Sequence, residues 1–260
     1  MSPTKTALIT GASNGIGYEL SKLFAADGYN LVLVARSAPK MDELAQELSS
    51  QHKISVTVLA KDLSLAGAAN EIYQAVTAQK IQIDVLVINA GFGIREQFAK
   101  TSSEDVQQML QLNVVSLTIL THLFLPGMKQ RGIGRILNVG STGSFSPVAN
   151  MTVYGATKAY VLSFSEALAE ELRGTDVSVT ALCPGVTVTG FQARVGVGET
   201  HMHRISKMTA KEVAQIGYQA MQRREAVVVS GLINRLMIES IRFTPRALVR
   251  RLTHRLMGEI

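Results

Sequence analysis

The chain has 260 residues, of which 47% are hydrophobic and 18% are charged. This composition is typical of a globular protein with a sizeable core and excludes an intrinsically disordered chain. The net charge is +6, but residues 231–260 hold six arginines against two glutamates, so that segment carries +4 and residues 1–230 carry only +2. A body so close to neutral argues against a general nucleic-acid-binding surface.

The N-terminus and the cysteine content favour a cytoplasmic protein. The opening sequence MSPTKTALITGAS lacks a charged region followed by a long apolar run, so we expect no signal peptide. No stretch approaches the roughly 18 uncharged apolar residues of a membrane span. Cys183 is the single cysteine, so no disulfide can form within the chain, which fits a reducing compartment.

Short apolar runs alternate with amphipathic stretches along the chain. Their β-branched, nearly continuous apolar character is typical of strands buried on both faces. The alternation predicts an α/β fold, a single-domain Rossmann-type doubly wound parallel sheet of about seven strands with helices on both faces. The runs lie at residues 6–10, 30–36, 54–60, 84–90, 135–141, 177–183 and 226–230.

No flexible linker interrupts this pattern, so we expect one domain. Residues 1–230 would form the catalytic, nucleotide-binding part, including a substrate lid at 190–207. Residues 231–260 would add a basic helical extension. Ligands of such sheets bind beyond the carboxyl ends of the strands, so we expect the functional motifs at those ends.

A glycine-rich turn follows the first predicted strand, in the sequence TGASNGIG. Glycines there allow tight backbone angles and a close approach to a pyrophosphate, and the following helix offers free N–H groups. An ordinary tight turn is the alternative, which the strand-turn-helix context disfavours. The residues expected at the phosphates are Gly11, Ser13, Asn14, Gly15, Ile16 and Gly17.

The second predicted strand ends in Arg36 and Ser37, where NAD-binding proteins usually carry an acidic residue. A carboxylate would bind the ribose 2′-hydroxyl and repel a phosphate. An arginine beside a hydroxyl can bind the 2′-phosphate instead. We therefore predict NADP(H) in preference to NAD(H), with a solvated loop arginine as the alternative.

Tyr154 and Lys158 lie four residues apart in YGATK, so both side chains fall on one face of a predicted helix. The tyrosine pKa is ordinarily near 10, and a neighbouring ammonium group would lower it. The pair could then exchange a proton with a carbonyl oxygen. Ser141 ends the fifth strand, where its hydroxyl could bind the same oxygen. Alone, Y-x-x-x-K is common, and a solvated helix face is the alternative.

Together, the T-G-x-x-x-G-x-G turn and the Y-x-x-x-K pair resemble the short-chain dehydrogenase/reductase family. Further elements of that family's pattern follow in order between Thr6 and about residue 190. They are Asp62-Leu63 after the third strand, Asn89-Ala90-Gly91 after the fourth, Asn113 within a helix, and Pro184-Gly185-Val186-Thr187-Val188-Thr189 after the sixth.

The resemblance implies a catalytic set and an activity. Tyr154 would protonate the developing alkoxide, Lys158 would lower the tyrosine pKa and hold the nicotinamide ribose, and Ser141 would orient the oxygen. Asn113 would hold a water that links Lys158 to solvent. The activity implied is NADPH-dependent reduction of a carbonyl to an alcohol.

The remaining matched positions imply cofactor contacts. Asp62 with Leu63 would lie by the adenine and Asn89, Ala90 and Gly91 along the same edge. Pro184, Gly185, Val186 and Thr189 would lie near the nicotinamide end, Val186 at the carboxamide and Thr189 at a phosphate or the carboxamide. Family members are usually homodimers or homotetramers, and we expect pairing through the helix near 104–125 and the helix that carries Tyr154.

Two alternatives come from other functional classes. A catalytically silent NADP-binding regulatory protein would be free to lose the four catalytic positions, and all four are present. A methyltransferase would explain neither YGATK after Ser141 nor Arg36.

The substrate is predicted only by class. Phe92, Phe145 and Val148 are uncharged and bulky, and we expect them to wall the pocket, which favours an apolar carbonyl. A 3-ketoacyl reductase and a hydroxysteroid-type or general carbonyl reductase both remain open. His201 and His203 lack an evident third ligand, so we expect no metal.

The basic tail has its own pattern. Thr244-Pro245 predicts a helix start with threonine as N-cap. Leu248, Val249, Leu252 and Leu256 would share one face, with arginines on both sides. A helix docked on the body or on a second subunit is the favoured interpretation. Peripheral contact of residues 244–260 with an anionic membrane is the alternative.

Overall fold

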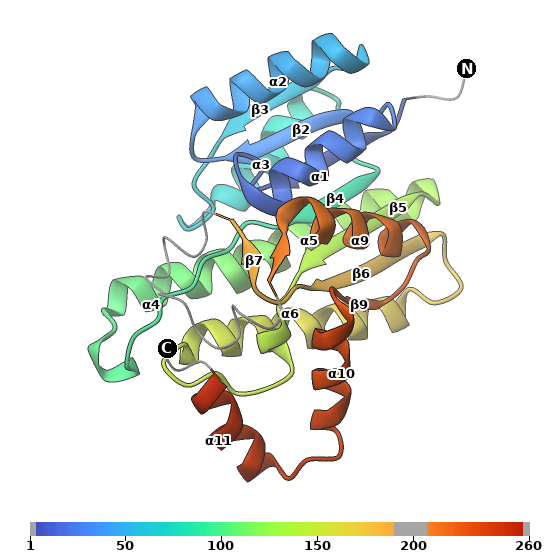
Figure 1. Cartoon of the computed structure of the whole chain (residues 1–260). Helices are drawn as coiled ribbons and strands as arrows, with labels where there is room; N and C mark the ends of the chain where they lie inside the picture. The colour runs from blue at the N-terminus through green and yellow to red at the C-terminus, as the bar shows by residue number, and fades with distance from the viewer. Residues whose placement is uncertain (1–3, 190–206, 257–260) are drawn as a thin grey trace.

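Seven parallel strands form one sheet in the order β3-β2-β1-β4-β5-β6-β9 (Figure 1). The structure is a computed structural model that describes residues 4–189 and 207–256. The predicted doubly wound α/β fold is confirmed. The strand order reverses between β1 and β4, and this is the switch point at which such sheets bind their ligands.

Every predicted strand is present, and several end one or two residues before the apolar run does. Arg36, Asn89 and Ser141 therefore lie just beyond a strand, in the loops at the carboxyl edge of the sheet. The strands are β1 Thr6–Thr10, β2 Asn30–Ala35, β3 Val56–Ala60, β4 Val85–Ile88, β5 Gly134–Val139, β6 Val177–Cys183 and β9 Val227–Val229.

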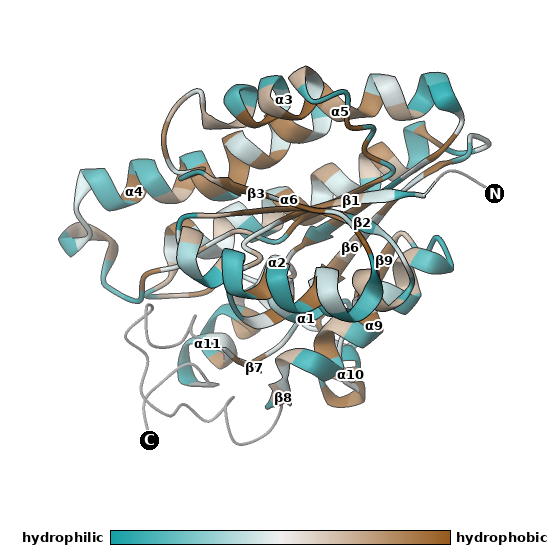
Figure 2. Cartoon of the chain, turned by 90° about the horizontal axis from the view of Figure 1, so that it is seen from above, coloured by the Kyte–Doolittle hydropathy of each residue, from teal (hydrophilic) through white to brown (hydrophobic). Residues whose placement is uncertain are grey.

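Helices cover both faces of the sheet, and a separate apolar cluster fills each interface (Figure 2). One face packs against α1 (Gly15–Ala26), α2 (Ala38–His52) and α9 (Ala210–Gln222). The other packs against α3 (Ala68–Ala78), α5 (Leu117–Arg131) and α6 (Thr152–Glu171). The five central strands are buried on both sides, which explains why their sequences are continuous apolar runs and not alternating ones, whereas the edge strands β3 and β9 are only partly buried.

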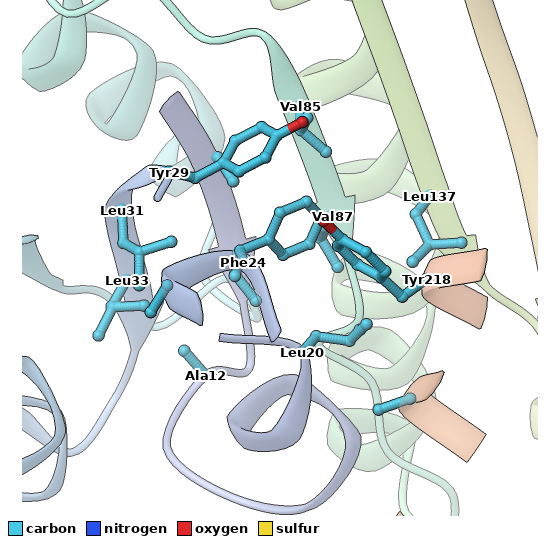
Figure 3. Close-up of a cluster of buried hydrophobic side chains, with 14 of the residues drawn as sticks. Ala12, Leu20, Phe24, Tyr29, Leu31, Leu33, Val85, Val87, Leu137 and Tyr218 are labelled. Carbon is cyan, nitrogen blue, oxygen red and sulfur yellow. The ribbon is translucent and has the colours of Figure 1, made fainter. Parts of the chain in front are cut away.

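Aromatic contacts join the N-terminal and C-terminal parts of the chain (Figure 3). The Phe24 ring of α1 packs edge-on against Tyr29, with centroids 5.2 Å apart, and against Tyr218 of α9, 4.8 Å apart. The Tyr218 hydroxyl also donates a hydrogen bond to Asp27 at the end of α1. These contacts fix α9 beside the helix that follows the glycine-rich turn.

The helical stretch expected over residues 103–131 is continuous but not regular. It comprises α4 (Ser103–Leu110), a π-helical turn at Gln111–Ser116 and α5. By length and composition alone, this is one stretch among the described residues that could cross a membrane. Leu117, Leu120 and Phe124 pack into the core against the sheet, so the fold itself accounts for its apolar character.

Two helices, α10 (Leu232–Ile241) and α11 (Arg246–Leu256), follow the last strand. The predicted N-cap of the tail helix is wrong. The Thr244 hydroxyl donates a hydrogen bond of 2.8 Å to the carbonyl of Ser240 in α10, the preceding helix, and does not cap α11. Helix α11 contacts the body, since Val249 is buried and the Thr253 hydroxyl donates 3.0 Å to the Pro147 carbonyl. The boundary after residue 230 stays a prediction.

Beyond β6, the short parallel pair β7 (Thr187–Val188) and β8 (Met208–Thr209) flanks the predicted lid. The lid at 190–207 lies outside the described residues except for Lys207, and so do His201 and His203.

We expect Tyr218→Phe to lower the free energy of unfolding by about 1 kcal/mol, because it removes a hydrogen bond to a carboxylate and keeps the ring contacts. Urea unfolding at neutral pH measures this. Tyr73→Phe is the matched control, since the Tyr73 ring packs edge-on against Phe124 at 5.2 Å in the same way. Equal losses in both variants would contradict the role of the Asp27 bond.

Candidate active site

A cleft of about 570 Å³ opens at the carboxyl ends of the strands, over the switch point. It gathers residues from the glycine-rich turn and from the loops after β2, β3, β4, β5 and β6. Most predicted site residues line it: Gly11, Ser13, Asn14, Gly15, Ile16, Arg36, Ser37, Asp62, Leu63, Asn89, Ala90, Gly91, Ser141, Val148, Tyr154, Lys158, Pro184, Gly185, Val186 and Thr189. Gly17, Phe92, Asn113 and Phe145 do not.

The Thr10 hydroxyl joins the glycine-rich turn to the loop after β4. Its Oγ1 accepts hydrogen bonds from the backbone N–H groups of Asn89 and Ala90, both at 3.0 Å, and donates to the Val87 carbonyl at 3.3 Å. In return, Asn89 Nδ2 donates to the carbonyls of Thr10 and Gly11. Thr10 is fully buried and was not singled out from the sequence.

The turn has the shape of an anion cradle. Gly11 adopts a φ of +67°, and a Cβ on Gly17 would lie 2.4 Å from the Gly11 carbonyl oxygen. Gly17 therefore lets α1 approach the turn and does not itself line the cleft. Asn14 caps α1, accepting from the Gly15 N–H at 2.7 Å. The remaining N–H groups and the positive end of the helix dipole suit a pyrophosphate.

Three cations line the end of the cleft beyond β2 and β3. The predicted Arg36 is exposed there, and Lys40 and Lys61 accompany it. Lys61 pairs with Glu71 at 2.6 Å. Neither lysine was predicted from the sequence, although Lys40 lies in α2 four residues after Arg36, about one helical turn further along. This positive charge fits a ribose 2′-phosphate.

Asp62 lies on the same side but is engaged within its own loop. It accepts hydrogen bonds from the Ser64 backbone N–H at 2.9 Å and from the Ser64 hydroxyl at 2.7 Å. Its contribution is a fixed loop conformation after β3.

Ser141 begins a short 3₁₀ turn, Thr142–Ser144, directly after β5. Its hydroxyl accepts from the Gly143 N–H at 3.0 Å. Ser144 Oγ accepts from the Ser141 N–H at 3.2 Å and donates to the Lys158 carbonyl at 2.7 Å. Ser144 therefore holds the Ser141 loop against α6, a role that no sequence signal indicated.

Tyr154 and Lys158 share one face of α6, as the spacing predicted, and that face lines the cleft. Lys158 Nζ donates to the Val139 carbonyl at 2.8 Å and lies 5.8 Å from the centroid of the Tyr154 ring. The loop after β4 approaches the pair closely. A Cβ on Gly91 would lie 3.3 Å from Lys158 Nζ, and one on Gly93 would lie 2.8 Å from Tyr154 Cδ2.

The direction predicted for the Tyr154 pKa is wrong for these contacts. Burial raises the pKa of Tyr154 to about 12, although a hydrogen bond with Ser141 acts in the opposite sense. Burial also lowers the pKa of Lys158 to about 8. Desolvation penalises both charged forms, and Lys158 Nζ is directed to the Val139 carbonyl. Tyr154 is therefore protonated at neutral pH and able to donate.

Asn113 lies in the π-helical turn and is buried. Its Oδ1 accepts from the Phe92 N–H at 3.1 Å, and its Nδ2 donates to the Phe92 carbonyl at 2.8 Å and to Thr157 Oγ1 at 3.1 Å. Asn113 thus ties the loop after β4 to α6, one residue before Lys158. π-Helical turns often occur at functional sites because they redirect a side chain.

The three residues expected to wall the substrate pocket lie in different places. Val148 lines the cleft. Phe92 does not, because its side chain is buried and its backbone pairs with Asn113. Phe145 packs against Leu162, Ala181 and Cys183, away from the cleft. Leu112 and Met151 also line the cleft and were not predicted.

Arg36→Asp should weaken NADPH binding by roughly a hundredfold and leave NADH binding within a few fold, because it replaces a phosphate-binding cation with a repelling carboxylate. Fluorescence titration with both nucleotides measures this. Lys22→Asp on α1, outside the cleft lining, is the matched control. Equal losses for the two nucleotides would refute the assignment of Arg36 to the 2′-phosphate.

The free energy of unfolding should depend on pH because Lys158 is buried. Its folded pKa of about 8 lies below the ordinary 10.5, so the unfolded state binds more protons between these values and stability rises with pH across that window. Lys158→Met lacks this rise. The variant's stability relative to wild type should therefore fall by up to about 3 kcal/mol as the pH passes from 8 to 10.5.

Urea unfolding of both proteins across this pH range tests the prediction. Lys211→Met, which removes an exposed lysine of α9, should show a constant difference from wild type. A constant difference for Lys158→Met as well would show that the burial of Lys158 does not lower its pKa.

Comparison with known proteins agrees with this site. Residues 5–200 match the family model for short chain dehydrogenases. The ketoacyl reductase HetN of Nostoc sp. is 33% identical over 228 residues, 86% of this chain and 78% of that protein. The NADP-dependent 3-hydroxy acid dehydrogenase YdfG of Escherichia coli K12 is 36% identical over 180 residues, 69% of this chain and 71% of that one.

Among solved structures, the short-chain dehydrogenase from Sphingobium yanoikuyae in complex with NADPH superposes with a TM-score of 0.84 at 31% identity, over 95% of each chain. The cofactor in that structure and in the name of the E. coli relative agrees with the cations found beyond β2 and β3. The chain belongs to the short-chain dehydrogenase/reductase family and is an NADP-dependent oxidoreductase acting on CH–OH or C=O groups.

Proposed function

We propose that this enzyme reduces an apolar carbonyl compound to the alcohol, with Tyr154 as the general acid. The observation that carries the proposal is the convergence of Ser141, Tyr154 and Lys158 in the cleft that also holds the glycine-rich turn. NADPH, when bound, supplies the hydride. The protein supplies the placement of groups and the proton.

Each residue of the site has a distinct part in moving that proton. Tyr154 and Ser141 are hydrogen-bonded, so two hydroxyl groups converge where a carbonyl oxygen can accept from both. Tyr154 donates its proton to the oxygen as negative charge develops there. Lys158 Nζ, 5.8 Å from the centroid of the Tyr154 ring, offsets part of the negative charge of the phenolate that results, although burial dominates the pKa of Tyr154. We propose that Asn113 positions this pair through Phe92 and Thr157 and supports the relay to solvent.

An apolar substrate is favoured by the wall around Tyr154. Val148 and Met151 line the cleft, and Met151 lies with the Tyr154 ring against Gly93. The three cations beyond β2 and β3 lie at the opposite, nucleotide end, so they are not available to a phosphorylated substrate. The relatives' names favour an acyl compound with a keto or hydroxyl group. A hydroxysteroid-type ring is the competing class within the same reaction.

The proposal includes a homodimer or homotetramer in the cytoplasm. Leu110 and Val115 on the α4–α5 stretch and Tyr160 on α6 are large apolar side chains about 40% exposed. A second subunit could cover them. Cys183 is buried and free, which is compatible with a reducing compartment.

Consumption of NADPH by the pure protein tests the activity directly. The panel should contain 3-ketoacyl thioesters, ketosteroids, aldehydes and small ketones, with NADH in parallel. We expect turnover with NADPH and a preference for the apolar members. Tight NADPH binding without turnover of any member would instead favour a catalytically silent NADP-binding protein.

Tyr154→Phe should reduce kcat by at least about a thousandfold, because no other group at that position can donate a proton to the alkoxide. NADPH affinity should stay within a few fold of wild type, since the ring is retained. Tyr160→Phe, on an exposed part of the same helix, is the control and should keep full activity. Normal turnover by Tyr154→Phe would remove this residue from the mechanism.

A further inference from the structure

The C-terminal helices expose an unusual amount of apolar surface. Phe243, in the loop between α10 and α11, is 89% exposed, and Leu232 and Leu236 of α10 are 72% and 61% exposed. Leu248 and Leu252 of α11 are nearly half exposed. Figure 1 shows that the loop between the two helices lies at one extremity of the molecule. We refer to residues 232–255 with these side chains as the C-terminal surface.

The same segment is strongly basic. Arg242, Arg246, Arg250, Arg251 and Arg255 are all exposed. The sequence has no acidic residue from 240 to 258. Within residues 4–189 and 207–256, Arg242 pairs with Glu239 at 3.3 Å, and no carboxylate lies within ion-pair distance of the four arginines of α11.

The body of the protein does not account for these exposed groups. Helix α10 faces the body through Asn234 and Ile238, and α11 does so through Val249 and Thr253. Those contacts use other side chains, so Leu232, Leu236, Phe243, Leu248 and Leu252 remain exposed after both helices have docked.

The positive charge and the exposed apolar side chains together indicate which kind of partner the C-terminal surface binds. A second copy of this chain has no acidic excess to offer, because its first 230 residues carry +2 and its own tail carries +4. A nucleic acid would pair with the arginines but would leave the phenylalanine and leucines in water. An anionic lipid surface satisfies both, since its headgroups attract arginines and its acyl boundary takes up apolar side chains.

We propose that the C-terminal surface docks peripherally on an anionic membrane. Docking would bring the substrate end of the cleft toward the lipid, because Thr253 contacts Pro147 and the adjacent Val148 lines that cleft. An apolar carbonyl substrate could then enter from the bilayer. This last consequence rests on the proposed function, whereas the docking itself does not.

Co-sedimentation of the full chain with lipid vesicles tests the docking. One set of vesicles contains phosphatidylcholine alone, and the other includes about a quarter phosphatidylglycerol. We expect at least tenfold tighter binding to the anionic vesicles, and a marked loss at high salt because ionic attraction is screened.

Two sets of substitutions separate the charged and the apolar contributions. An arginine near an anionic surface contributes roughly fivefold to the partition coefficient, so R250S/R251S/R255S should weaken binding by roughly a hundredfold. F243S/L248S should weaken it by at least about tenfold, because two apolar side chains no longer enter the lipid. R173S/R223S/R224S removes the same charge from exposed arginines of the body and is the matched control.

NADPH titration of every variant checks that the nucleotide site still folds. Equal binding to neutral and anionic vesicles, or equal losses in the control and tail variants, would overturn the proposal. The proposal would also be overturned if the wild-type protein binds neither kind of vesicle and the F243S/L248S substitutions dissociate its oligomer. The C-terminal surface would then be a contact between subunits. Failure of the carbonyl panel would leave the vesicle result unchanged, so the two proposals can fail separately.

Discussion

The cleft depends on the hydrogen bonds of the buried Thr10 hydroxyl, which join the glycine-rich turn to the loop after β4. At the switch point, β1 and β4 end side by side, and the backbone N–H groups after β4 have no strand to pair with. Thr10 Oγ1 accepts from two of them and donates to Val87. An unpaired buried N–H group is costly, so this one side chain fixes the glycine-rich turn relative to the loop after β4. That loop in turn packs on Tyr154 and Lys158 through Gly93 and Gly91, which connects the cofactor end of the cleft to its chemical end.

Burial sets the electrostatics of that chemical end. Tyr154 remains protonated well above neutral pH, whereas Lys158 loses its proton more readily than an exposed lysine. An acid that keeps its proton until charge develops on a bound oxygen is what a reductase needs. The same arrangement has a cost in stability, because a charged lysine is held out of water with the Val139 carbonyl as its hydrogen-bond acceptor.

The fold was predictable because the central strands are buried on both faces, so short β-branched apolar runs alternate with amphipathic helical stretches along the chain. The nucleotide turn and the Ser141–Tyr154–Lys158 set were predictable because their order and spacing resemble a family pattern. Arg36 was predictable because it stands at the end of the second strand, where an NAD-binding protein usually carries an acidic residue. The direction in which a side chain points was not predictable. Phe92 and Phe145 follow the right motifs, yet they turn into the core, since sequence proximity to a site does not specify which way a side chain points.

The predicted direction of the Tyr154 pKa shift was wrong for a related reason. The spacing of Tyr154 and Lys158 indicates that a charged group is near, but it does not indicate how deeply the tyrosine is buried. Thr10, Ser144 and Lys40 were missed because their importance comes from contacts between segments distant in sequence or across a helix turn. The family pattern also implied a relay role for Asn113, which stays a proposal, but it did not indicate the observed contacts of Asn113 with Phe92 and Thr157.

Isotope transfer from the cofactor tests the central claim, that this cleft moves hydride to a carbonyl carbon. NADPH carrying deuterium at both hydrogen positions of nicotinamide C4 would be incubated with the protein and the panel's carbonyl compounds, and the products would be analysed by mass spectrometry and NMR. We expect alcohol with one deuterium on the carbinol carbon, formed by wild type and by Tyr160→Phe but not by Tyr154→Phe. Deuterium retained entirely in the nicotinamide, with NADPH bound in the cleft, would contradict it.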